Sequence, residues 1–254
     1  NTADINGGGV EIFDYSSAII INTTIISNSA STAGGVDISN HSVAKFDSTL
    51  ILSNTVDTNG GGINISNHSI AEVDSARIQL NTASINGGGI NISNHSTASI
   101  NKTSIQSNGA SNGGGIDISD NSTTHLNYTT IQSNNAGYGG GMKVVNNSTV
   151  NMNNTVIQSN IVTTDGAGVS ILDSTVINIT DSRITSNNAI RYGGGIYINS
   201  INGRNSLNIE NSFIQGNQTS GWNGFENRGI AGGGIYIASS PLENTTATIN
   251  KTVF

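Results

Sequence analysis

A glycine-rich triplet followed by an apolar residue recurs along the whole chain of 254 residues. Its third glycine marks each copy and falls at Gly9, Gly35, Gly62, Gly89, Gly115, Gly141, Gly168, Gly195 and Gly234. The first seven intervals are 26 or 27 residues and the last is 39. A fixed period of this length is typical of a solenoid, in which each repeat buries its apolar face only against its neighbours.

A second motif, Ile-x-x-Asn, begins 16 residues after the marker glycine in seven coils. Its asparagines are Asn28, Asn54, Asn81, Asn108, Asn134, Asn160 and Asn187. Only 7 or 8 residues separate each asparagine from the next marker, and all variation in coil length lies there. We therefore expect a fixed scaffold with one variable loop at a corner. The asparagine is expected to form an internal ladder that bonds backbone groups left unpaired by a bend.

Within each coil the apolar residues alternate with polar ones, as at Ile63 and Ile65, which indicates strands with one buried face. A second strand is marked eleven residues after the glycine, and a third carries a Thr-x-Ile segment. We predict an all-β, right-handed parallel β-helix of about nine coils of 26–27 residues, with three strands per coil. Residues 1–254 are expected to form a single domain, a segment of a longer array, with an expanded loop at residues 217–234.

The composition limits the partners of such a rod. Charged residues make up 10% of the chain, the formal net charge is −7 and no basic cluster is present. We therefore expect neither nucleic acid nor an anionic membrane as a partner. No apolar run approaches the length of a membrane span, so this segment is not expected to insert into a membrane. The chain contains no cysteine, so disulfides do not hold it together.

Sixteen asparagines begin the motif Asn-x-Ser/Thr, the acceptor signal for N-glycosylation. They are Asn22, Asn40, Asn64, Asn67, Asn91, Asn94, Asn101, Asn121, Asn127, Asn146, Asn147, Asn153, Asn178, Asn217, Asn244 and Asn250. The expected ladder also includes Asn1 and Asn217, and among its members only Asn217 belongs to this motif, whereas outward positions repeat it in columns. We interpret this pattern as N-glycosylation, which implies covalent N-glycans and an extracellular or cell-surface location.

Two columns of side chains could bind metal ions. The first consists of three histidines in consecutive coils, His41, His68 and His95. Because stacked coils place such ligands side by side rather than around one point, we expect a solvated turn ladder and no transition-metal site. The second is an acidic group expected to face outward: Glu11, Asp14, Asp37, Asp117 and Asp120. These residues are spread over several coils, whereas calcium needs several oxygens at one point, so no metal site is predicted.

A column of threonines includes Thr49, Thr103, Thr129 and Thr155. A regular threonine ladder on a flat β-helix could match ice. The column is single and is interrupted by Ala76, so the sequence does not favour ice binding.

The expanded loop contains the only tryptophan of the chain. Aromatic side chains beside a groove could stack on sugars or seat a partner. The candidate ligand-binding residues are Trp222, Phe225, Arg228, Tyr197 and Tyr236, the last two expected in an outward column at the base of the loop. The alternative is that Trp222 and Phe225 only pin the loop to the wall of the solenoid.

Catalysis on acidic polysaccharides would require clustered carboxylates with arginine or lysine, or paired aspartates for acid and base chemistry. The sequence has no Asp-Asp pair, and its nine lysines and arginines are spread along the chain. We therefore expect no enzyme, no catalytic residue and no cofactor.

The pairing of Gly-Gly-Gly-Ile with Ile-x-x-Asn resembles the repeat of the chlamydial polymorphic outer-membrane proteins, Gly-Gly-Ala-Ile with Phe-x-x-Asn. Similar repeats occur in other pectin-lyase-like surface proteins. The resemblance covers nearly the whole chain, but glycine replaces the family's frequent alanine at Gly62, Gly89 and Gly115. Isoleucine likewise stands where that family has phenylalanine, as at Ile78 and Ile105. The resemblance implies a right-handed β-helix used in adhesion.

These observations favour a structural and adhesive extracellular rod, heavily N-glycosylated, within a cell-surface protein or filament. Its exposed end strands are expected to pair with another copy or with neighbouring domains of the same chain. The alternative is a carbohydrate-binding module that uses the loop around Trp222, or a non-catalytic part of a polysaccharide-active enzyme.

Overall fold

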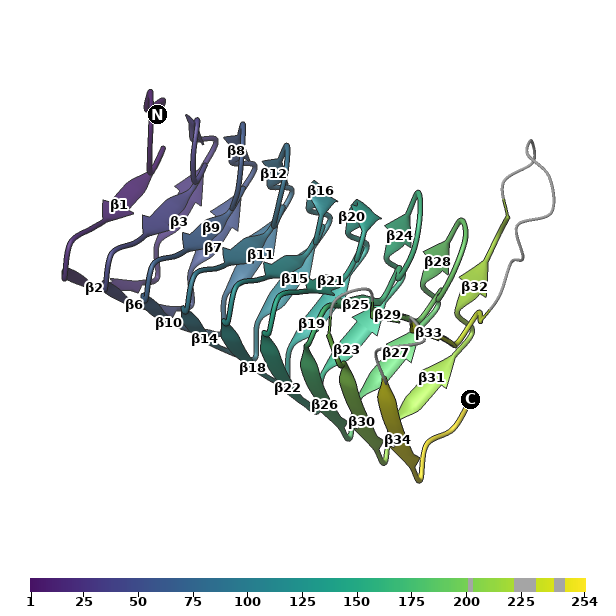
Figure 1. The fold of residues 1–254 in the computed structure, drawn as a ribbon. Coiled ribbons are helices and arrows are strands. Elements are labelled where there is room, and N and C mark those ends of the chain that lie inside the picture. Colours follow the sequence, from purple (N-terminus) through teal and green to yellow (C-terminus); the bar gives the residue numbers. More distant parts are fainter. Residues whose placement is uncertain (201–202, 222–231, 240–244) are drawn as a thin grey trace.

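The computed structural model describes residues 1–200, 203–221, 232–239 and 245–254. In this part of the chain every strand pairs in parallel with the equivalent strand of the next coil, and the coils follow one another from the N-terminus to the C-terminus (Figure 1). The predicted all-β parallel β-solenoid is confirmed. The largest sheets have nine strands, so the chain makes about eight turns rather than the nine coils predicted.

Four sheets run along the stack, so each coil contributes about four strands and not the three predicted. The first sheet, after the glycine triplets, contains β1 (Val10–Ile12), β5 (Val36–Ile38), β9 (Ile63–Ile65), β13 (Ile90–Ile92), β17 (Ile116–Ile118), β21 (Met142–Val144), β25 (Val169–Leu172), β29 (Ile196–Ser200) and β33 (Ile235–Ser239). The second contains β2 (Ser17–Ile21), β6 (Val43–Asp47), β10 (Ile70–Asp74), β14 (Thr97–Asn101), β18 (Thr123–Asn127), β22 (Thr149–Asn153), β26 (Val176–Thr180), β30 (Ser206–Glu210) and β34 (Thr246–Asn250).

The two remaining sheets have eight strands each. The third, which carries the Ile-x-x-Asn motif, contains β3 (Thr24–Ile26), β7 (Leu50–Leu52), β11 (Arg77–Gln79), β15 (Ser104–Gln106), β19 (Thr130–Gln132), β23 (Val156–Gln158), β27 (Arg183–Thr185) and β31 (Phe213–Gln215). The fourth contains β4 (Ser29–Ala30), β8 (Thr55–Val56), β12 (Thr82–Ala83), β16 (Gly109–Asn112), β20 (Asn135–Tyr138), β24 (Ile161–Val162), β28 (Asn188–Ala189) and β32 (Gln218–Thr219).

The strands of the fourth sheet lie at the start of the segment between the ladder asparagine and the next marker glycine, which was predicted to be only a loop. Most of its strands are two residues long, with an exposed residue followed by a buried one, as at Thr82 and Ala83. Such a short alternation gives little signal in a single coil. Stacking nevertheless buries the inner residues, and Ala136, Val162, Ala167 and Ala189 form a second apolar cluster separate from the main core.

The main core is built from the predicted apolar columns. The isoleucines of the Ile-x-x-Asn motif are buried from Ile25 to Ile184, and those of the first sheet, such as Ile63 and Ile65, have no exposed surface. Because each buried methylene contributes about 0.8 kcal/mol, a continuous aliphatic stack stabilises the fold without cross-links.

The predicted asparagine ladder is confirmed. It runs without interruption from Asn1 to Asn217, each side chain donating to the next asparagine's Oδ1. At Asn81, Nδ2 donates to Asn108 Oδ1 at 3.1 Å and to the carbonyl of Ile51 at 3.0 Å. The backbone N–H of Asn81 also donates to Asn108 Oδ1, at 3.0 Å. The ladder therefore satisfies backbone groups at a bend, where strand pairing does not reach them.

The three glycines of a triplet are constrained in different ways, although alanine replaces the first at Ala33 and the second at Ala167. Gly87 has a φ of +61°, which a residue with a side chain rarely adopts. A Cβ on Gly88 would lie 2.4 Å from the carbonyl oxygen of Gly109. A Cβ on Gly89 would lie 2.6 Å from the carbonyl oxygen of Gly115 in the next coil. At the marker position the next coil is therefore too close for an alanine.

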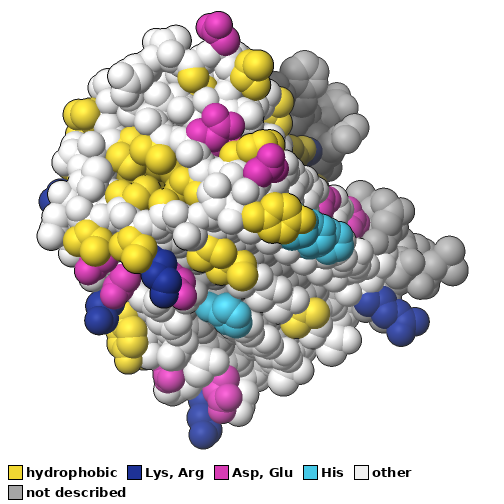
Figure 2. Space-filling view, turned by 90° about the vertical axis from the view of Figure 1, so that its left-hand side faces the viewer, with side chains coloured by type: hydrophobic (Ala, Val, Ile, Leu, Met, Phe, Trp, Pro, Cys, Tyr) yellow, Lys and Arg dark blue, Asp and Glu magenta, His cyan; other side chains and the backbone are white. Residues whose placement is uncertain are grey.

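The surface of the stack is dominated by uncharged side chains (Figure 2). Seen from the end where β1 lies, the view shows apolar side chains gathered on the end face. No other coil covers the core side chains of the first coil on that side. Ile19, Ile21 and Ile26 are among the exposed apolar residues of this coil. The described residues include no helix of the length and apolarity needed to cross a membrane.

Candidate functional site

The asparagines of the sixteen glycosylation motifs fall into three groups by exposure. Those that are exposed are Asn22, Asn67, Asn94, Asn121, Asn146, Asn147 and Asn250. Those that are half-buried are Asn40, Asn101, Asn127, Asn153, Asn178 and Asn217. Asn64 and Asn91 are only 5% and 2% exposed, so a glycan has no room at either position in the folded chain. Asn244 lies outside the described residues.

The repeated Asn-His-Ser motif has a structural role at each of its positions. In the copy at residues 67–69, Asn67 and His68 adopt positive φ values of 53° and 63°, and asparagine is among the residues that tolerate this conformation best. Ser69 is fully buried, and its Oγ accepts the backbone N–H of Ser42 in the preceding coil at 3.1 Å. Repetition of the motif in a column therefore follows from the turn and from a buried serine ladder.

The Asn-x-Thr column arises in the same way. Asn127 Nδ2 donates to Asn101 Oδ1 at 3.0 Å, Tyr128 has a φ of 51°, and Thr129 is buried. The hydroxyl of Thr129 donates to the carbonyl of Ile100 at 3.0 Å. The threonine column is thus an internal ladder and not an outward face, which removes the surface that ice binding would need.

The three histidines form the solvated turn ladder that was predicted. Tyr15, His41, His68 and His95 stack in succession with ring centroids 4.9 Å apart and planes within 4° of parallel. All four side chains are exposed, and histidine side chains are visible as a row on the flank of the stack (Figure 2). Parallel imidazoles do not converge on one point. Among the described residues no group of three or more His, Cys, Asp or Glu side chains could hold a metal ion.

The expectation that the acidic arc faces outward is wrong for two of its members. Asp37 is 2% exposed and Asp117 is 1% exposed, although each lies between two inward residues of a first-sheet strand. The start of the glycine triplet packs over this outer face, since a Cβ on Gly113 would lie 2.7 Å from the backbone nitrogen of Asp117. The column is therefore covered on both faces of the sheet.

Burial changes the chemistry of these two carboxyl groups. Desolvation raises the pKa of Asp117 to about 6, and the nearby Lys143 only partly opposes this shift. Lys143 Nζ lies 3.9 Å from Asp117 Oδ1, which accepts no hydrogen bond from the described residues. Desolvation also raises the pKa of Asp37, although its carboxylate accepts hydrogen bonds from Asn64 at 2.7 Å and Ser39 at 2.8 Å.

The structure brings Tyr197 and Tyr236 together, as the sequence suggested. They are direct partners in β29 and β33, with ring centroids 5.7 Å apart. Tyr192 joins them, with its ring 4.6 Å from that of Tyr236. Tyr197 is only 8% exposed, burial raises its pKa, and its hydroxyl accepts a hydrogen bond from Asn199 at 3.0 Å. The rings stack mainly on one another, which supports a packing role for this cluster.

Trp222, Phe225 and Arg228, the other candidate ligand-binding residues, lie outside the described residues. The sequence reasoning missed Tyr138, Asp165 and Tyr192, which share the position three residues before the marker glycine in successive coils. In other coils this position is often asparagine, as at Asn86 and Asn112, so a change to tyrosine or aspartate was a detectable signal. Arg191, beside Tyr192, donates from Nη2 to Asp165 Oδ2 at 2.8 Å.

The fold and these arrangements define a parallel β-solenoid with buried polar ladders, a tyrosine cluster and a surface on which uncharged side chains predominate. Comparison of the chain with protein-family models, with curated proteins and with solved structures finds no match.

Proposed function

We propose that the chain is a structural and adhesive rod of a cell-surface or extracellular protein. The observation that carries this proposal is the continuity of its side-chain ladders along the axis. Besides the asparagine ladder, Gln79, Gln106, Gln132 and Gln158 bond in series at 2.8 Å on the outer face of the third sheet. Bending or sliding the coils would break many such bonds together, so the stack is stiff. Eight turns at ~4.8 Å span about 38 Å.

An adhesive role is supported by the resemblance of the repeat to that of adhesins and by the exposure of ordered polar columns on the flanks. Beads coated with the folded chain should bind to cells or to an immobilised extracellular matrix more than albumin-coated beads do. Equal attachment of the two bead types to every surface would overturn the adhesive part of the proposal. The chain should also associate end to end, because β1 and β2 each have one edge that no other strand of the chain covers. Sedimentation velocity at increasing protein concentration measures this association.

We also propose that the exposed sequons carry N-glycans. Asn67 and Asn94 are exposed, whereas Asn64 and Asn91 are buried, and both pairs lie within motifs of the same type. Secretion of the chain from a eukaryotic host, followed by glycopeptide mapping, is expected to find glycans on the first pair and none on the second. Absence of glycans from all sites, or occupancy of Asn64 in folded material, would contradict the proposal.

A further inference from the structure

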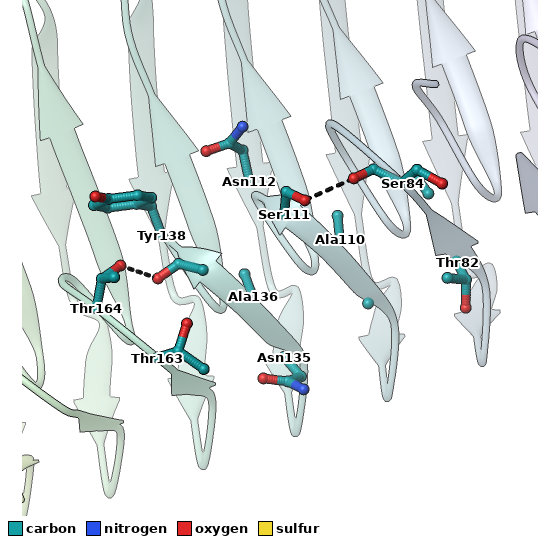
Figure 3. Close-up of a pocket in the computed structure, with 13 residues that line it drawn as sticks. Thr82, Ser84, Ala110, Ser111, Asn112, Asn135, Ala136, Tyr138, Thr163 and Thr164 are labelled. Carbon is teal, nitrogen blue, oxygen red and sulfur yellow. Dashed lines mark hydrogen bonds between the residues drawn. The ribbon is translucent and has the colours of Figure 1, made fainter. Parts of the chain in front are cut away.

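The fourth sheet carries a shallow hollow of about 730 Å³ on its outer side (Figure 3). It is lined by residues of β12, β16 and β20, by neighbouring residues and by Thr163 and Thr164, which follow β24. Its volume lies within the range of about 300–1,000 Å³ found for small-molecule sites, although the hollow is open to solvent.

The hollow exists because two consecutive coils are short. Only 7 residues separate Asn108 from Gly115 and Asn134 from Gly141, whereas 8 separate the corresponding residues of the coils on either side. In the short coils the fourth strand extends to four residues, as β16 and β20, and runs directly toward the triplet. The longer coils on either side border the hollow through Thr82, Ala83 and Ser84 and through Thr163 and Thr164.

The floor of the hollow includes a glycine that packing does not require. Gly109 occupies the column that holds Thr82 in the coil before it and Asn135 in the coil after it. A Cβ on Gly109 would meet only the carbonyl oxygen of Asn135, at 3.9 Å, and no positive φ demands a glycine there. The triplet glycine Gly88, by contrast, has backbone atoms within 2.4 Å of such a Cβ. The absence of a side chain at Gly109 therefore leaves the hollow open at this position.

One end of the hollow carries an aromatic ring held in place by charged neighbours. Tyr138 is 37% exposed, and the described residues provide no ring that stacks on it. Its hydroxyl interacts electrostatically with the nearby Arg191, which in turn is paired with Asp165 at 2.8 Å. Asp165 Oδ1 also accepts the backbone N–H of Tyr192 at 3.2 Å. Tyr138 is thus positioned before any ligand arrives.

The remaining lining is uncharged and rich in hydrogen-bonding groups. Thr82, Asn135 and Thr163 are exposed, and their side-chain polar groups have no partner among the described residues. Ser111 Oγ and Thr164 Oγ1 donate to the carbonyls of Ser84 and Gly137, which ties the walls to adjacent coils (Figure 3). The methyl groups of Ala110 and of the threonines add apolar surface.

From this geometry we propose that the hollow binds a neutral saccharide. A sugar ring has an apolar face, which matches a positioned tyrosine, and a rim of hydroxyls, which matches threonine and asparagine side chains. The thirteen lining residues include no charged side chain, and the charge of Arg191 beside Tyr138 is already paired with Asp165, so an acidic sugar gains no free counter-charge in the hollow. The proposal depends neither on glycosylation of this chain nor on its rod-like assembly.

The test uses chitotriose, cellotriose and α-mannotriose as neutral probes and trigalacturonate as an acidic probe, each at millimolar concentration with the full chain. Saturation-transfer NMR is expected to show contact with at least one neutral probe. Tyr138→Ala is expected to weaken that binding by about tenfold or more. The matched control is Tyr128→Ala, which removes an exposed tyrosine from the turn between β18 and β19 and should leave binding unchanged.

Gly109→Thr provides an independent variant, because it fills the hollow with the residue that the same column has at Thr82. It should fold, since threonine suits a strand and the added Cβ meets no close atom. It is expected to abolish saccharide binding with an unchanged far-UV circular dichroism spectrum. Absence of contact with all three neutral probes, equal binding of trigalacturonate, or equal loss in Tyr128→Ala would overturn the proposal. Glycan occupancy and bead attachment are measured independently of these outcomes. Failure of the saccharide proposal is therefore distinguishable from failure of the proposed function.

Discussion

Replacement of Asp117 by asparagine is predicted to stabilise the chain at neutral pH. Asn64 and Asn91 occupy the same column, and Asn91 Nδ2 donates to Asn64 Oδ1 at 2.8 Å. An asparagine at position 117 would extend this ladder by one member. It would also remove a carboxylate that is buried, accepts no hydrogen bond at Oδ1 and has its cationic neighbour Lys143 3.9 Å away.

The magnitude follows from the pKa of Asp117, which burial raises from 3.8 to about 6. Below pH 3.8 the carboxyl group is protonated in both the folded and the unfolded chain, so ionisation costs nothing. As pH rises toward 6 the unfolded chain loses this proton first, so the free energy of unfolding decreases. Above pH 6 the loss is complete and amounts to about 3 kcal/mol.

Equilibrium urea unfolding, followed by far-UV circular dichroism from pH 4 to pH 7.5, measures this effect. Asp117→Asn is expected to be more stable than the unmodified chain at pH 7.5, by up to about 3 kcal/mol, and the difference should shrink as pH falls toward 4. Subtracting the free energies of unfolding of the two proteins at each pH cancels the contributions of the other acidic groups. A difference that does not change with pH, or a less stable variant at pH 7.5, would refute the reasoning.

Two features of the experiment make it specific. The exposed Asp57→Asn removes the same formal charge without burial, so its stability relative to the unmodified chain should change little with pH. Asp117→Asn creates the sequence Asn-Ile-Ser, a new glycosylation motif, so both variants are produced in a bacterial host that does not attach N-glycans.

Two further predictions concern the scaffold. Asn108→Ala removes the acceptor of the Asn81 backbone N–H and the donor to the Ile78 carbonyl, so urea unfolding should show a loss of about 3 kcal/mol or more. Asn94→Ala removes an exposed asparagine from an outer ladder and should cost less than about 1 kcal/mol; equal losses would contradict the role given to the inner ladder. Gly89→Ala places a Cβ 2.6 Å from a backbone oxygen and should lower the free energy of unfolding by about 1–3 kcal/mol, whereas an unchanged midpoint would show that the corner can expand.

The parts of the fold that could be predicted from sequence are those repeated at constant spacing with strong chemical identity. The isoleucine column and the asparagine ladder fall in this class, because every coil requires the same apolar side chain and the same hydrogen bonds. The fourth sheet could not be predicted in the same way. A strand such as Thr82–Ala83 has one inward residue, and parallel pairing with Thr55 and Val56 in the preceding coil, not local alternation, defines it.

The candidate site was only partly predictable for a related reason. Tyr197 and Tyr236 share a strand register, so their contact follows from the period. The interaction of Tyr138 with Arg191 joins residues at different positions of coils two turns apart. It depends on how the chain folds at the corner, so the repeat period does not predict it. Asp117 was misplaced because alternation alone puts it outside, whereas the chain that folds over the first sheet covers it.

The glycosylation motifs illustrate how a solenoid can produce a signal through its own packing. In Asn67-His68-Ser69 the turn favours asparagine and the buried ladder needs serine, so recurrence of the motif does not by itself indicate modification. Asn22-Thr23-Thr24 is different: Asn22 and Thr24 are both exposed, and equivalent positions hold unrelated residues such as Lys102 and Arg77. Because the fold demands neither residue there, occupancy of Asn22 in secreted protein would support glycosylation independently of the repeat. An unmodified Asn22 beside modified asparagines of the repeated columns would instead show that modification follows those columns.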